Sequence, residues 1–215
     1  MTEGELREQM VHFARQMIST GLIRGTSGNL STREPGADTC LITPSGVDYE
    51  TMRAEDIVLV DLSGRSVSQG LKASVDTPIH VAIYRARPDA GGCIHTHSPY
   101  AAAFSTVGRE IPPLITESAG YVGGPVRVIH YVPPAQTDTG DLVAAGLGRD
   151  RAVLLPNHGV IAIGENLKKA FGAAMAVEES AEVAFIATQL GQPSLVPDAE
   201  VARMHEFIHF RYGQR

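Results

Sequence analysis

Apolar residues recur every three or four positions at the start of the chain, which predicts a helix over residues 3–20. A Gly-rich turn occupies residues 25–29 and ends the helical pattern. Short runs of apolar and β-branched residues then predict strands at 30–33, 39–43 and 57–61. The first part of the chain is therefore expected to form one helix followed by a group of short strands.

The rest of the chain mixes both kinds of pattern. Thr77-Pro78 is typical of a helix start, with a capping residue followed by proline at the first helical position, and the helix should run to about Ala86. Further strands are expected at 91–95, 126–131, 153–155 and 160–163, and further helices at 98–105, 140–147, 166–190 and 199–212. This order lacks the strict alternation of a doubly wound parallel sheet. We expect an α/β fold with one mixed sheet covered by helices, in a single domain over residues 1–215.

Composition and charge exclude several classes of function. The chain carries 18 Lys+Arg against 24 Asp+Glu, a net charge of −6. This acidic balance does not favour binding to nucleic acid. No apolar run approaches the roughly 18 residues of a membrane-spanning helix, and the N-terminus shows no secretory signal. Cys40 and Cys93 cannot form a disulfide framework. We therefore expect a cytoplasmic protein without a membrane or nucleic-acid partner.

The scarcity of lysine argues against covalent catalysis on a carbonyl substrate. A Schiff-base enzyme needs a lysine amine that is desolvated in a pocket. This chain has lysine only at Lys72, in a predicted loop, and at Lys168 and Lys169, in a polar stretch of a predicted helix. The eight histidines direct attention to a metal instead.

His95 and His97 follow an apolar strand and are separated by one residue. Residues i and i+2 of a strand point to the same face, so both imidazoles could reach one ion. His158, which precedes Gly159 between two predicted strands, is a third candidate. Three histidines with an open fourth position are typical of catalytic zinc. The alternative is that the pair consists of polar residues at a sheet edge.

The other histidines fit a metal site less well. His80 lies one helical turn after Asp76, which favours a supporting role over ligation. His12, His205 and His209 lie on amphipathic helical patterns, and we expect them at the surface.

Five motifs resemble, in order, those of the class II aldolase/adducin family, from about residue 5 to Tyr212. They are Gly25–Ser31, Ile42–Val47, Ser74–His80, His95–Ser98 and Asn157–Gly159. The resemblance implies a three-layer α/β/α fold with a central, largely antiparallel sheet. It also implies a cyclic homotetramer with active sites between neighbouring subunits.

The resemblance also implies roles for particular residues. His95, His97 and His158 would bind one Zn²⁺ per chain, although another divalent ion would also suit them. The phosphate or carboxylate of the substrate would be held by a set of small and polar residues: Thr26, Gly28, Asn29, Ser45, Gly46 and Ser74. Asp76 would transfer protons or bind the metal, and Tyr212 would act in a neighbouring subunit's site.

Several positions depart from the family pattern. Asp76 stands where the aldolases carry Glu and the epimerases carry Asp, and its carboxylate is one methylene shorter than that of Glu. Val75 replaces a serine that helps to hold phosphate, so the anion site has lost one donor. Thr116 replaces a catalytic tyrosine of the aldolases, and Gly120 replaces a catalytic aspartate of the epimerases. Glu117 or Tyr121 could substitute from an adjacent subunit.

Together these features predict a zinc-dependent aldolase (a lyase) of carbohydrate metabolism. Its substrate would be a sugar or hydroxy-ketone, for example a ketose 1-phosphate such as L-fuculose 1-phosphate, cleaved through a metal-stabilised enediolate. Alternatives within the family are a sugar-phosphate 4-epimerase and a decarboxylase. An adducin-like interaction domain without activity is the alternative from another class, and retention of all three histidines speaks against it.

Overall fold

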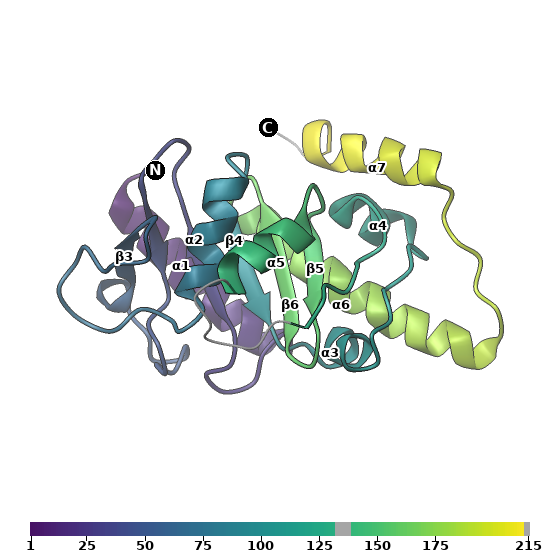
Figure 1. Ribbon diagram of the computed structural model, residues 1–215, viewed down its shortest axis with the longest axis horizontal. Coiled ribbons are helices and arrows are strands. Elements are labelled where there is room, and N and C mark those ends of the chain that lie inside the picture. The colour runs from purple at the N-terminus through teal and green to yellow at the C-terminus, as the bar shows by residue number, and fades with distance from the viewer. Residues whose placement is uncertain (132–138, 213–215) are drawn as a thin grey trace.

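The computed structural model describes residues 1–131 and 139–212 and is built around a six-stranded sheet (Figure 1). The strands lie in the order β3-β2-β1-β4-β6-β5. Their bounds are β1 (Asn29–Thr32), β2 (Thr39–Ile42), β3 (Val58–Asp61), β4 (Gly92–Thr96), β5 (Ala152–Leu155) and β6 (Gly159–Gly164). All pairings between these strands are antiparallel. We expected a mixed sheet. Within the described residues, the one parallel pairing is an isolated bridge between Val128 and Leu154.

Helices cover both faces of the sheet. One layer contains α1 (Glu3–Ser19), α3 (Pro99–Thr106) and α6 (Leu167–Leu190), and the other contains α2 (Thr77–Ala86) and α5 (Thr139–Leu147). The 3-10 turn η1 (Ala54–Asp56), α4 (Thr116–Val122) and α7 (Asp198–Phe210) complete the described elements. This is the three-layer α/β/α arrangement that the family resemblance implies. No helix in the described ranges is both long and apolar enough to cross a membrane.

The alternation of side chains along the strands places one apolar core on each face of the sheet. On β4, Cys93 joins the core beneath α2 and α5, whereas Ile94 joins the core beneath α1 and α6. On β6, Ile161 and Val160 divide between the two cores in the same way. Successive side chains of a strand point to opposite faces. β5 and β6 are buried on both sides and therefore consist of continuous apolar and glycine residues, whereas the equally buried β1 carries polar side chains.

All predicted elements except one are confirmed within one or two residues. The strand expected at 126–131 is wrong. Val126 and Val128 make only isolated bridges, to Ile111 and Leu154, so no continuous ladder forms in the described part of that segment. The sequence analysis missed α4, whose seven residues are too few to show a helical period.

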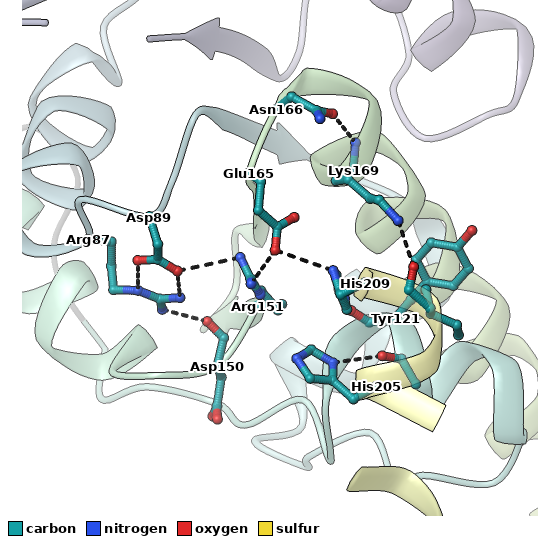
Figure 2. A network of polar contacts seen from close by, with 12 residues as sticks. Arg87, Asp89, Tyr121, Asp150, Arg151, Glu165, Asn166, Lys169, His205 and His209 are labelled. Atoms are coloured by element: carbon teal, nitrogen blue, oxygen red, sulfur yellow. Dashed lines mark hydrogen bonds and ion pairs between the residues drawn. The ribbon is translucent and has the colours of Figure 1, made fainter. Parts of the chain in front are cut away.

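The C-terminal helix α7 is fastened by polar contacts, which corrects the expected surface position of two histidines (Figure 2). His205 Nδ1 lies 2.8 Å from the carbonyl oxygen of Gly120, and His209 Nε2 lies 3.1 Å from that of Tyr121. The other ring nitrogen of His209 faces Glu165 at 3.4 Å, and the His209 side chain is only 2% exposed. These imidazoles contact the last turn of α4. Tertiary packing therefore covers a helix face that the sequence pattern places at the surface.

Candidate metal centre

The end of β4 and the turn between β5 and β6 bring three histidines together. His95 belongs to β4 and His97 follows it, while His158 lies in the turn before β6. Gly159 permits this close approach, because a Cβ there would lie 2.1 Å from the carbonyl oxygen of Thr96 and 2.9 Å from His97 Cδ2. Antiparallel pairing of β4 with β6 thus places His158 against the two other rings.

The three imidazoles converge through their Nε2 atoms. His95 Nε2 lies 2.9 Å from His97 Nε2 and 3.2 Å from His158 Nε2. His95 Nδ1 lies 2.9 Å from the carbonyl oxygen of Val160, so it must carry the proton, and Nε2 presents its lone pair to the cluster. Tetrahedral zinc with Zn–N bonds of about 2.0–2.1 Å implies an N···N separation of about 3.3–3.4 Å. The observed separations are close to this value, and the three residues fit a divalent ion.

Burial keeps this cluster in the form that binds a metal. It lowers the pKa of His95 to about 3, and the pKa of His97 is lowered by burial and by the neighbouring His158. Both imidazoles are therefore neutral near pH 7. A metal ligand must be deprotonated, so binding need not displace a proton from either ring at that pH.

Asp76 lies beside the cluster at the start of α2. Its Oδ2 is 3.9 Å from His95 Nε2 and accepts a 2.7 Å hydrogen bond from Asn29 Nδ2. Burial raises the pKa of Asp76, but the favourable contacts of the carboxylate, among them the hydrogen bond from Asn29, outweigh burial and hold the pKa below its usual value. Asp76 makes no side-chain capping bond to α2. Its ionised carboxylate faces the histidines instead of the helix backbone.

A cleft of about 250 Å³ opens over these residues. Asp76, His97 and His158 line this cleft. All six predicted substrate-binding residues line it as well, namely Thr26, Gly28, Asn29, Ser45, Gly46 and Ser74. Gly28 has a φ of 84°, and a Cβ there would lie 2.7 Å from the carbonyl oxygen of His95. Glycine is therefore required where this turn passes over the backbone of His95.

The cleft offers backbone donors for an anion. Among the described residues, no acceptor receives the N–H groups of Gly28, Gly46 or Val75. A backbone N–H group without an acceptor in the protein is available to donate to a ligand. Val75 itself lines the cleft and is 75% exposed.

Two predicted catalytic residues lie elsewhere in the chain. Tyr212 is exposed and lines a second groove together with residues of α1 and α6, including Phe13 and Phe171. Glu117 is exposed on the first turn of α4. Neither lines the cleft within one chain, so the expectation that they act in a neighbouring subunit's site stays a prediction.

The sequence analysis did not single out Ser31 or Tyr84, which lie behind the site. Ser31 Oγ lies 2.6 Å from His80 Nδ1 and 2.8 Å from the Tyr84 hydroxyl, and His80 Nε2 lies 2.6 Å from Asn29 Oδ1. A serine on a fully buried strand and a tyrosine four residues after His80 were the available signals.

Comparisons with known proteins agree with this geometry. The sequence model of the class II aldolase and adducin N-terminal domain matches residues 8–185. A 5-deoxy-D-ribulose 1-phosphate aldolase from Bacillus thuringiensis serovar kurstaki is 35% identical over 211 residues, covering 97% of each chain. An L-ribulose-5-phosphate 4-epimerase from Salmonella paratyphi C is 33% identical, covering 98% of this chain and 99% of the epimerase.

A solved structure extends the similarity to the whole fold. An L-fuculose 1-phosphate aldolase superposes with a TM-score of 0.90 at 30% identity, covering 96% of this chain and 97% of the aldolase. The match spans the strands and turns that carry the histidine cluster and the cleft. The chain therefore belongs to the class II aldolase and adducin family.

Proposed function

We propose that the protein is a zinc-dependent aldolase that cleaves a ketose 1-phosphate. One observation carries the proposal: three converging imidazoles, an ionised carboxylate and several small turn residues gather around a single cleft. The similarity to 5-deoxy-D-ribulose 1-phosphate aldolase and to L-fuculose 1-phosphate aldolase supports a deoxy-ketose 1-phosphate as the substrate.

The reaction breaks the C3–C4 bond of the ketose. The electron pair of this bond moves toward the C2 carbonyl and the C4 hydroxyl releases its proton to water. C3 later gains a proton from Asp76, whose ionised carboxylate first takes one up from water. The products are dihydroxyacetone phosphate and an aldehyde, which is acetaldehyde for a 5-deoxyketopentose. A divalent ion held by His95, His97 and His158 supplies Lewis-acid polarisation of the carbonyl.

Asp76 is the group proposed to handle the proton at C3. Its carboxylate is ionised and held by Asn29 on the side of the cleft where His95 lies. General acid–base catalysis requires a group within hydrogen-bond reach of the reacting atom, and Asp76 lines the cleft that would hold it. Tyr212 of a neighbouring subunit is proposed to face the C4 oxygen and to orient the departing aldehyde.

The turn residues are proposed to hold the phosphate. Ser45 and Ser74 line the cleft together with Gly28, Gly46 and Val75, whose backbone N–H groups have no acceptor among the described residues. Backbone donors bind phosphate without regard to the side chain, so the loss of a serine at position 75 leaves part of the anion site intact.

Val75→Ser is expected to strengthen binding of a ketose 1-phosphate. The added hydroxyl would supply one more donor, worth about 0.5–1.5 kcal/mol, or up to about 3 when the partner is charged. KM for the phosphorylated substrate should fall, while a matched non-phosphorylated ketose should bind no better. Val107→Ser, which changes an exposed valine after α3, is the control. If both variants leave KM for the phosphate ester unchanged, position 75 does not contact the anion.

The packing of α4 speaks against 4-epimerisation. The resemblance places the acid/base of the epimerases at position 120, where this chain has glycine. Gly120 is buried under α7, and a Cβ would lie 2.8 Å from Ile208 Cδ1 and 2.9 Å from Met204 Cβ. No carboxylate can occupy that position in this packing.

The proposed site needs a neighbouring subunit, so we expect a homotetramer. Tyr212→Phe should lower kcat by roughly 10²-fold, at the lower end of the range for a proton-transferring group, and leave the metal content unchanged. Phe210→Tyr, which changes an exposed ring two residues earlier, is the matched control. Sedimentation that shows a fully active monomer would contradict the shared site.

The reaction is tested by following all three family chemistries on the same purified protein. The metal-loaded protein is incubated with 5-deoxyribulose 1-phosphate, L-fuculose 1-phosphate, L-ribulose 5-phosphate and a 3-keto sugar acid phosphate, which is the only one of the four that can release CO₂. Aldehyde release is followed by coupled reduction, C4 inversion by NMR and CO₂ release by trapping. Aldehyde and dihydroxyacetone phosphate in equal amounts are expected from a ketose 1-phosphate. Inversion or decarboxylation without aldehyde would replace the aldolase assignment.

A further inference from the structure

A row of polar side chains leads from the interior of the protein to Asp76. It consists of Tyr84, Ser31, His80 and Asn29, and the first three are 0% exposed while Asn29 is 4% exposed. Every neighbouring pair in the row lies within hydrogen-bond distance, between 2.6 and 2.8 Å. We name these four residues the polar row. It runs between the sheet and α2, in a region otherwise packed with apolar side chains.

The direction of every hydrogen bond in the polar row is fixed from its Asp76 end. The carboxylate can only accept, so Asn29 turns its amide nitrogen toward Asp76 and its oxygen toward His80. His80 must then donate from Nε2. Burial lowers the pKa of His80 to about 4, so the ring is neutral near pH 7 and its Nδ1 is an acceptor. Ser31 donates to that nitrogen and leaves its own oxygen to accept from Tyr84.

The fixed directions matter because an amide has two nearly equivalent orientations. If the Asn29 amide turned over, its oxygen would face the Asp76 carboxylate and its NH₂ would face the donor on His80. His80 in the Nε2–H tautomer therefore selects the orientation of Asn29 that binds Asp76. The other tautomer would place a lone pair against Asn29 Oδ1, and the hydroxyl of Ser31 disfavours it by donating to Nδ1.

We infer that His80 is a positioning residue that acts through Asn29 on Asp76, with Ser31 and Tyr84 holding its tautomer. The inference rests on the proposed function, because it assumes that Asp76 acts in the reaction. None of these three residues lines the cleft, so they have no direct route to the substrate. Groups that orient a functional side chain typically contribute a factor of 10 to 100 in activity or metal affinity.

The first test separates positioning from folding by comparing two substitutions at one position. His80→Phe keeps a ring but removes the donor to Asn29, and His80→Gln keeps an amide donor near the former Nε2. We expect His80→Phe to lower kcat by roughly 10- to 100-fold with little change in KM, and His80→Gln to recover most of the loss. Equal activity of both variants, or equal loss in both, would overturn the inference.

Substitutions at Ser31 and Thr32, which are neighbours on β1, separate an effect on positioning from a general effect on packing. Ser31→Ala removes the donor to His80 Nδ1 and should lower kcat. Thr32→Val removes a buried hydrogen bond to the carbonyl oxygen of Gly91, one residue away on the same strand. It should lower thermal stability by a similar amount and leave kcat unchanged. If kcat falls equally in both variants, the effect is one of packing, and the inference fails.

The tautomer is measured without any reaction. In Zn²⁺-loaded protein with ¹⁵N-labelled histidine, long-range ¹H–¹⁵N spectra distinguish a protonated Nε2 from a protonated Nδ1. We expect His80, assigned by its loss in His80→Gln, to be the Nε2–H tautomer in wild type and a mixture in Ser31→Ala. An Nδ1–H or cationic His80 in wild type would overturn the inference. Wild type that releases no aldehyde but shows the Nε2–H tautomer would instead contradict the proposed function.

Discussion

His97→Ala is expected to remove the metal ion and nearly all activity while the protein remains folded. His97 contributes one of three converging nitrogens, and two histidines cannot hold a divalent ion as firmly as three. Lewis-acid stabilisation of the developing charge is worth several kcal/mol, so turnover should fall by roughly 10³-fold or more. His97 is half-buried at the mouth of the cleft, which makes its removal tolerable for the fold.

The measurement is metal content by atomic emission together with kcat and thermal unfolding. Wild type should contain close to one divalent ion per chain, and a chelator should abolish its activity until Zn²⁺ is restored. His12→Ala, which removes an exposed histidine of α1, should retain the ion. Full activity of metal-free wild type would remove the metal from the mechanism.

Local patterns in the sequence were sufficient to predict the sheet and its covering helices. Helix α6 begins after Asn166 and ends at Leu190, within one residue of the predicted range 166–190. Thr77-Pro78 correctly predicted the start of α2, but the cap position is occupied by Asp76, and Thr77 is already the first helical residue. The pairing of strands was not readable from periodicity, because all six strands are short and most are buried on both faces.

The metal cluster was predictable in part from spacing. His95 and His97 had to share a face, because they are two residues apart at the end of a strand. His158 was named as a third candidate from its place before Gly159 between two predicted strands. Its approach to the pair depends on the pairing of β4 with β6, which periodicity does not give. The substrate-binding residues were implied by the family resemblance, and the fold brings their separate turns together around Asp76.

The contacts behind the site could not be predicted, because they join segments far apart in the chain. Asn29 and Asp76 are 47 positions apart, and Ser31 and Tyr84 are 53 apart. Each of these residues has an ordinary explanation in its local pattern. Sequence reasoning likewise treated His205 and His209 as surface residues, because their contacts with α4 lie more than 80 positions away. Tertiary packing decides both cases.

Asp76→Asn is expected to lower kcat by roughly 10²- to 10⁴-fold, the usual contribution of general acid–base catalysis. The substitution preserves the size of the side chain and an oxygen that can accept from Asn29, but it removes the charge and the ability to take up a proton. KM and metal content should stay close to the wild-type values if proton transfer is the main role of Asp76.

The control variants distinguish proton transfer from ligation. Asp141→Asn removes an exposed carboxylate of α5 that pairs with Arg85, and it should leave kcat unchanged. Asp76→Glu keeps the charge on a chain one methylene longer and should retain more activity than Asp76→Asn. If Asp76→Asn loses metal before it loses turnover per bound ion, the carboxylate acts mainly as a ligand, 3.9 Å from His95 Nε2 as it stands. Unchanged kcat and unchanged metal content would exclude Asp76 from the mechanism and leave Asn29 holding a carboxylate with no part in the reaction.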